Sequence, residues 1–181
     1  RLGGAVEDRP GYDLTGVAVG SEGTFGIVTR ATLRLVRVPE AYRTLLAVFD
    51  SVEAASEAVS GIIAAGIVPA ALEMMDQLII GAVEAAYGIG LPTDAGAVLL
   101  VEIDGPAAGL DEHLSRIEAV CRHHQARECR VARDDAERAA LWKARKRAFG
   151  AVGRLAPNYC TQDGVVPRTR VPDILRAIQA A

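Results

Sequence analysis

Three glycines recur at every third position in the segment Gly20-Ser-Glu-Gly-Thr-Phe-Gly26, which runs directly into Ile27 and Val28. Glycines this close together leave little side-chain bulk and reach positive φ easily, so a phosphate or a flat ring could lie against the backbone N–H groups. The spacing matches neither the Walker loop nor the dinucleotide-binding motif, both of which enter a helix. From the residues alone, an ordinary turn before a strand is the commoner explanation.

The second group that could do chemistry is Arg145, on a helix predicted to start at Asp134 with a capping-box-like sequence. On a helical wheel Arg145 lies about 40° from Leu141, inside the apolar stripe. A guanidinium stays charged at ordinary pH, so its burial requires a partner. That partner is either a carboxylate of the chain, such as Asp163, or the carboxylate of a bound ligand, and pairs within the chain are commoner. The predicted stripe consists of Leu141, Trp142, Ala148, Phe149 and Val152.

Composition limits the classes of function. The 181 residues are 50% hydrophobic, which suffices for one main core. A formal net charge of −3 gives no basic face for nucleic acid or for an anionic membrane. No apolar run approaches the ~20 residues of a membrane helix. The three cysteines Cys121, Cys129 and Cys160 are too widely spaced for a metal clip or a disulfide framework, which predicts reduced thiols and a cytoplasmic location.

The remaining candidate groups carry less information. His113, His123 and His124 do not have the spacing of a zinc site, so no metal site is predicted. Ser21 does not lie in a nucleophile elbow. The chain begins Arg-Leu-Gly-Gly without an initiating Met, from which we expect a fragment of a longer protein.

The elements that must position these groups fall into two domains, 1–39 and 40–181, divided near Pro39. Residues 27–35 alternate apolar and polar side chains, which predicts a half-buried strand. From residue 43 the predicted order is two strand-helix-strand units with an extra helix between them. This order indicates an α+β, ferredoxin-like (split βαβ) domain with a mostly antiparallel sheet and helices on one face. The predicted elements are strands 44–49, 68–75, 98–103 and 128–132, helices from Ser51, Asp76, Pro106 and Asp134, a strand 159–166 and a last helix from Val171.

Three sequence segments resemble a known family: Asp8–Thr15, Val19–Thr29 and Ala31–Leu35 are similar to the end of the FAD domain in flavoproteins of the vanillyl-alcohol-oxidase type. The narrower resemblance is to FAD-linked subunits of glycolate oxidase and to FAD-dependent D-lactate dehydrogenases. It implies FAD as cofactor and residues 40–181 as a cap or substrate domain, incomplete at its C-terminus. It also implies flavin-lining roles for Gly20, Ser21, Glu22, Gly23, Thr24, Gly26, Ile27 and Val28.

The sequence Leu141-Trp-Lys-Ala-Arg145 is similar to the family motif L-W-x-x-R, which implies that Arg145 binds the carboxylate of a 2-hydroxy acid. Pro157–Pro167 resembles the strand that follows this helix. Relatives that oxidise D-2-hydroxyglutarate have a lysine where this chain has Thr161, which argues against a dicarboxylate substrate. The implied reaction is hydride transfer from a small D-2-hydroxy acid, glycolate or D-lactate, to FAD. The resemblance places the base and the metal ligands outside this chain, so it identifies no catalytic residue here and implies that the chain alone is inactive.

Two other functions remain open at this point. The first is a ferredoxin-like module without catalysis that binds a small acid or forms oligomers, because this fold hosts many functions. The second is a synthase acting on an alkyl-dihydroxyacetone phosphate, for which a basic phosphate pocket is expected and none is readable in the sequence. Further oxidase subunits, an electron acceptor and a homo-oligomer are partners that the resemblance leaves open.

Overall fold

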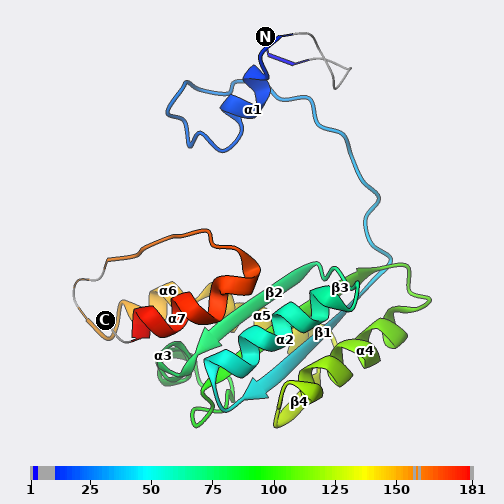
Figure 1. The fold of residues 1–181 in the computed structure, drawn as a ribbon, viewed down its shortest axis with the longest axis vertical. Helices are drawn as coiled ribbons and strands as arrows, with labels where there is room; N and C mark the ends of the chain where they lie inside the picture. The colour runs from blue at the N-terminus through cyan, green and yellow to red at the C-terminus, as the bar shows by residue number, and fades with distance from the viewer. Residues whose placement is uncertain (1, 4–10, 157, 159, 180–181) are drawn as a thin grey trace. The chain divides into compact units, whose positions relative to one another are not determined.

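The computed structural model describes residues 2–3, 11–156, 158 and 160–179. The chain forms two compact units, residues 1–38 and residues 39–181 (Figure 1). The first unit contains helix α1 (Leu14–Ala18), whose first turn is capped by the Asp13 carboxylate accepting from the Gly16 N–H. The glycine-rich segment follows α1 as a series of turns.

Residues 27–35 differ from their prediction, because no strand forms there. Ile27 is 91% exposed and Leu35 is 88% exposed. Alternation shows that one side of a segment is apolar, but a strand also needs a neighbour to take its backbone hydrogen bonds. In the described part of residues 1–38, no second strand lies beside this segment.

The second unit is built on one four-stranded sheet in which each neighbouring pair is antiparallel. The strand order is β2-β3-β1-β4, with β1 and β3 in the centre. Two helical connections, one between β1 and β2 and one between β3 and β4, complete the split βαβ plan predicted from the sequence. The α+β, ferredoxin-like fold is therefore confirmed. The strands are β1 (Ala41–Phe49), β2 (Ala71–Asp76), β3 (Ala97–Gly105) and β4 (Glu128–Val131).

Helices cover both faces of this sheet, whereas the sequence predicted helices on one face. Alternate residues of β1 explain why, since Leu45 packs in one core cluster and Leu46 in the other. Helices α2 and α4 lie side by side over the first face (Figure 1), and the second cluster includes residues of α3, α5 and α6. The helices are α2 (Val52–Ala64), α3 (Gln77–Tyr87), α4 (Leu110–His123), α5 (Asp135–Lys146) and α6 (Ala148–Val152).

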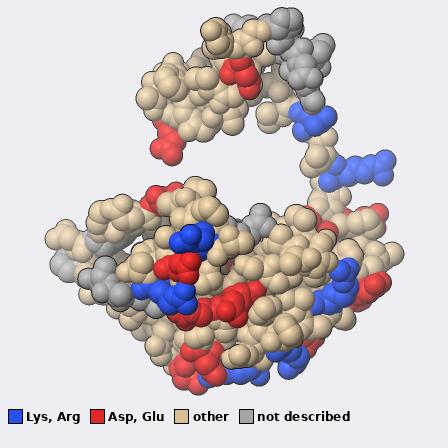
Figure 2. Space-filling model, in the orientation of Figure 1, with Lys and Arg blue, Asp and Glu red and all other residues tan. Residues whose placement is uncertain are grey.

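Local sequence signals fix several helix ends as predicted. Ser51, Asp76 and Asp134 each accept a hydrogen bond from a backbone N–H three residues further on, and so cap α2, α3 and α5. Helix α3 ends at Gly88, which adopts the left-handed conformation with φ 57°. Figure 2 shows acidic and basic side chains interspersed on the face that α2 and α4 cover, without a patch of one sign.

The helix that begins after Asp134 is shorter than the helical-wheel prediction assumed. Helix α5 ends at Lys146, and Arg147 leaves helical geometry with φ −96° and ψ 2° before α6 begins. The break rotates the later residues, so Phe149 is 59% exposed while Ala151 is fully buried. The prediction that Phe149 belongs to the buried stripe is therefore wrong.

The C-terminal part follows its prediction only in the last helix, α7 (Val171–Gln179), preceded by the short helix η1 (Arg168–Arg170). The strand predicted over 159–166 is absent from its described residues, which are irregular and exposed. Residues 157 and 159 lie outside the described residues. Leu175 of α7 packs against the core cluster shared by α2 and α4.

A partly buried contact between α3 and the loop after it provides the first test of the fold. The Glu84 carboxylate accepts hydrogen bonds from the backbone N–H groups of Ile89, Gly90 and Leu91 at 2.9–3.0 Å. Burial opposes ionisation, but these three donors outweigh it and lower the pKa of Glu84. At neutral pH we expect Glu84→Gln in the full-length protein to speed amide exchange of residues 89–91 by about tenfold or more, measured by hydrogen–deuterium exchange.

The effect should fade in acid, because a carboxyl group with a lowered folded pKa stabilises above its unfolded pKa and loses this contribution as pH falls through its folded pKa. Glu128→Gln is the matched control, since Glu128 is exposed on β4 and accepts no side-chain hydrogen bond from a described residue. Equal exchange in the two variants would contradict this description of the loop.

Candidate functional site

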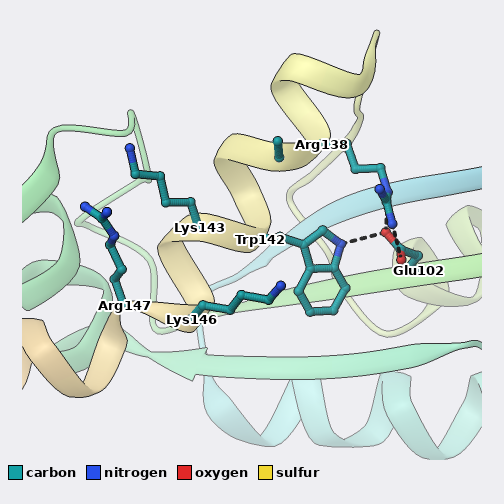
Figure 3. A pocket seen from close by; sticks show the side chains of 7 residues that line it. Glu102, Arg138, Trp142, Lys143, Lys146 and Arg147 are labelled. Atoms are coloured by element: carbon teal, nitrogen blue, oxygen red, sulfur yellow. Dashed lines mark hydrogen bonds and ion pairs between the residues drawn. The ribbon is translucent and has the colours of Figure 1, made fainter.

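A buried carboxylate, Glu102, lies on the central strand β3 and is only 6% exposed. One of its oxygens accepts from Thr44 Oγ1 at 2.7 Å, from Arg138 Nε at 2.7 Å and from Trp142 Nε1 at 2.6 Å. Its other oxygen accepts from Arg138 Nη2 at 2.7 Å (Figure 3). The carboxylate and the guanidinium therefore form a two-pronged pair, the strongest geometry for these groups.

Burial of Glu102 opposes ionisation, but the hydrogen bonds from Arg138, Thr44 and Trp142 outweigh it and lower the pKa of Glu102. The Arg138 guanidinium also lies 4.6 Å from the centre of the Tyr42 ring, within cation–π range. The Glu102 carboxylate is thus ionised, and its contacts with Arg138 and Thr44 form an anchor that connects α5 to β3 and β1. Because both oxygens of Glu102 already accept hydrogen bonds from the protein, Glu102 is not available as a general base.

Arg145 lies on the same side of α5, because residues 138, 142 and 145 are three or four positions apart. Its Nε donates to the Glu73 carboxylate on β2 at 2.8 Å, and the side chains of Arg145 and Glu73 are 35% and 32% exposed. Of the two alternatives left open by the sequence, a carboxylate of the chain is present, and it is Glu73 rather than Asp163, which lies in the exposed segment 160–167. The guanidinium is also only partly buried, whereas the sequence placed it within the apolar stripe.

The single contact through Nε leaves the outer edge of this guanidinium unused. Neither Nη atom of Arg145 donates a hydrogen bond to a described residue. An arginine held in this way keeps a pair of N–H donors that can take a planar oxyanion. Arg145 can therefore bind a second carboxylate while Glu73 holds its orientation.

A pocket of about 560 Å³ opens beside the anchor and along α5. Figure 3 shows the Trp142 indole with its N–H toward Glu102, and Lys146 extending toward the indole. Lys143 and Arg147, one turn apart, extend together away from it (Figure 3). The pocket is lined by Glu102, Arg138, Ala139, Trp142, Lys143, Lys146 and Arg147.

The glycine-rich loop of the first unit has the backbone that its sequence predicts. Gly20, Gly23 and Gly26 have φ of 78°, 78° and 150°, values that favour glycine. The N–H groups of Ser21, Thr24 and Gly26 close local turns. Ile27 is 91% exposed, and a Cβ atom added at any of the three glycines would meet nothing within 4 Å.

This geometry fits a flavin in one respect, because the loop presents glycine backbone and apolar side chains that a flat ring can cover. Gly20, Ser21, Glu22, Gly23, Thr24, Gly26, Ile27 and Val28 lie together in one continuous segment of the first unit. Arg145 belongs to the second unit.

Other candidate chemistry is sparse in the part of the chain that the structure describes. No group of three or more His, Cys, Asp or Glu side chains there could hold a metal ion. Cys121 is buried, whereas Cys160 is exposed, and all three cysteines are free thiols. Among the helices of the described residues, none is long and apolar enough to cross a membrane.

Comparison with known proteins identifies the family. Residues 38–181 match the family described as FAD linked oxidases, C-terminal domain. This chain belongs to the FAD-linked oxidases. The family confirms the resemblance inferred from the sequence and indicates FAD as the cofactor.

The relatives are of two kinds. The chain is 45% identical over 177 residues to glycolate oxidase subunit GlcD of Escherichia coli K12, covering 98% of this chain and 36% of that protein. The Bacillus subtilis subunit is 45% identical over 179 residues, covering 98% of the chain and 38% of that protein. A probable mitochondrial D-lactate dehydrogenase of Danio rerio is 36% identical over 168 residues, covering 91% of this chain and 33% of that protein. The chain thus spans about a third of the length of these relatives.

Among solved structures, an alkyldihydroxyacetonephosphate synthase shares the fold, with a TM-score of 0.65 at 15% identity. The match covers 97% of this chain and 37% of the synthase. At this identity the likeness concerns the fold alone.

Sequence reasoning found Arg145 but missed the two carboxylates that organise the site, Glu102 and Glu73. One signal for Glu102 was present, because an acid interrupts the most continuous apolar strand, Val98-Leu-Leu-Val-Glu-Ile103. A charge in such a strand must be paired. No comparable signal marked Glu73, whose strand is only partly buried.

Glu102→Gln tests the anchor. The substitution removes the charge that neutralises Arg138, so we expect the free energy of unfolding at pH 7 to fall by about 3 kcal/mol, measured by denaturant titration of the full-length protein. The difference should shrink in acid, because the lowered folded pKa means that the contribution is lost as pH falls through that value. Asp104→Asn on the same strand is the control, since Asp104 is exposed and makes no side-chain hydrogen bond to a described residue. A Glu102→Gln protein as stable as the control would refute the anchor role.

Proposed function

We propose that the full-length protein oxidises a small D-2-hydroxy acid, glycolate or D-lactate, to the 2-oxo acid with FAD as hydride acceptor. The family is FAD-linked, and relatives that are 45% and 36% identical are named as a glycolate oxidase subunit and a D-lactate dehydrogenase. One observation in the structure carries the proposal. Arg145 is held by Glu73 through Nε, while its two Nη groups donate no hydrogen bond to a described residue.

In this proposal Arg145 binds the carboxylate of the hydroxy acid. Two parallel N–H···O bonds from a guanidinium fix both the position and the plane of a carboxylate. Glu73 keeps the guanidinium from rotating, so less rotational freedom is lost when substrate binds. Fixing the carboxylate also fixes the adjacent Cα, from which the hydride leaves, and such positioning can contribute several kcal/mol to catalysis.

The glycine-rich loop would hold the flavin. We propose that Gly20, Ser21, Glu22, Gly23, Thr24, Gly26, Ile27 and Val28 line it, on the strength of the open glycine backbone and the exposed Ile27 and Val28. When bound, the flavin supplies the acceptor for the hydride and its two electrons, chemistry that belongs to the cofactor. This assigns residues 1–39 to the end of an FAD-binding domain and residues 40–181 to the substrate domain.

Partners and location extend the same proposal. Relatives named as subunits of glycolate oxidase support an assembly with further subunits or an electron acceptor. We also propose a cytoplasmic location, supported by the three free cysteines. A module without catalysis is disfavoured by the family match over residues 38–181.

Arg145→Lys is the direct test of the substrate clamp. Lysine keeps the charge but loses the fork of donors, so kcat/KM for glycolate or D-lactate should fall about 100-fold, the order expected when a charged hydrogen-bond pair is lost. Bleaching of the flavin absorbance by each hydroxy acid measures this in the purified full-length protein. Arg116→Lys is the control, because Arg116 lies on α4, away from Arg145, and donates a hydrogen bond to the Ala65 carbonyl oxygen. A clamp variant that bleaches as fast as the parent would contradict the role of Arg145, and a full-length protein without flavin would contradict the function.

Glu73→Gln tests the positioning role. Glutamine can still accept from Arg145 Nε but provides no charge, so we expect kcat/KM to fall about tenfold, while Glu73→Ala should lose more. Because Glu73 acts on the orientation of Arg145, the loss should appear mainly as a raised KM for the hydroxy acid. A loss of thermal stability with unchanged KM would make the Glu73–Arg145 pair purely structural.

A further inference from the structure

The pocket beside Trp142 has an unbalanced charge. Four of the side chains that line it are cationic, Arg138, Lys143, Lys146 and Arg147, and only Glu102 is acidic. Glu102 is already neutralised, because both of its oxygens accept from Arg138. Three positive charges therefore remain in a pocket of about 560 Å³.

None of these three cations forms an ion pair with a described residue. Lys143 and Lys146 make no polar side-chain contact with the described part of the chain, and Arg147 lies 5.3 Å from the centre of the Tyr87 ring. Some exposed arginines elsewhere in the second unit form ion pairs, as Arg127 does with Asp50 and Asp94. The charges of Lys143, Lys146 and Arg147 are not offset in this way by any described carboxylate.

The spacing of the three cations makes them repel one another. Lys146 and Arg147 lie three and four positions after Lys143 at the end of α5, a spacing at which like charges oppose each other. Trp142 and Ala139 provide an apolar wall, which limits screening by water and strengthens both this repulsion and any attraction to an anion. Lys143 and Arg147 extend together, whereas Lys146 extends toward the Trp142 indole (Figure 3), and an anion bound against these cations would offset their repulsion.

We propose that this pocket binds a small, multiply charged oxyanion of the phosphate or polycarboxylate class through Lys143, Lys146 and Arg147. Three cations favour a ligand with two or more negative charges over a monovalent acid. The volume is that of a small-molecule site, whereas a stable protein partner buries about 800 Å² on each side. The site is separate from the Arg145 clamp and does not depend on the proposed substrate.

The probes are inorganic pyrophosphate and citrate, titrated into the full-length protein by isothermal calorimetry at low ionic strength. Replacing two ammonium groups in Lys143→Gln/Lys146→Gln should weaken binding of the better probe at least about tenfold. The conservative pair Lys143→Arg/Lys146→Arg should restore binding. The control Arg116→Gln/Arg122→Gln removes the same charge from α4, on the other face of the sheet, and should bind like the parent.

Tighter binding of pyrophosphate would indicate a phosphoryl ligand, and tighter binding of citrate would indicate a polycarboxylate. Equal binding of the two probes would indicate that the site recognises negative charge alone. Binding should weaken as salt rises, because the site is open to solvent. The proposal is overturned if neither probe binds at millimolar concentration, or if the Gln pair and the α4 control lose affinity equally. It is also overturned if Arg145→Lys abolishes probe binding while the Gln pair leaves it intact. Melting curves of each variant separate lost binding from lost folding.

Discussion

Two ion pairs between α5 and the sheet hold the charged side chains of the candidate site in the second unit. Glu102 on β3 binds Arg138, and Glu73 on β2 binds Arg145. A carboxylate on a sheet face that is covered by a helix must be paired, because an unpaired charge there would cost several kcal/mol. Leu141 and Ala144 supply the apolar contact between the same helix and the sheet. The pairs fix the rotation of α5 about its axis.

This rotation gives the helix two chemically different edges. Toward the sheet, Arg138 donates through both Nε and Nη2, whereas Arg145 donates only through Nε. The first arginine is therefore structural, and the second keeps donors for a ligand. Lys143 and Lys146 line the neighbouring pocket with Arg147 and make no ion pair with a described residue. One helix thus carries the anchor and the proposed clamp, and lines the cationic pocket, within about three turns.

The sequence predicted features that depend on neighbours in the chain. Ser51, Asp76 and Asp134 act on backbone groups only three residues away, and the helix starts predicted at these residues are confirmed. Glu73 could not be assigned to Arg145, because the two residues are 72 positions apart and meet only through the packing of α5 on the sheet.

The missed features have the same origin. The alternation in residues 27–35 predicted a segment with one apolar side, but it could not show whether a neighbouring strand was present. The wheel from Asp134 assumed one continuous helix, and the break at Arg147 changed which later residues are buried. The basic pocket could not be predicted either, because the acidic residues that lie near Lys143, Lys146 and Arg147 depend on how α5 packs on the sheet.

The central claim is that Arg145 is held at one edge and binds a carboxylate at the other. The most direct measurement is a crystal structure of the full-length protein with FAD and oxalate, a planar mimic of the hydroxy acid. We expect both Nη atoms of Arg145 within hydrogen-bond distance, about 2.7–2.9 Å, of one oxalate carboxylate while Nε stays on Glu73. Oxalate bound elsewhere, with Arg145 paired only to protein carboxylates, would contradict the claim.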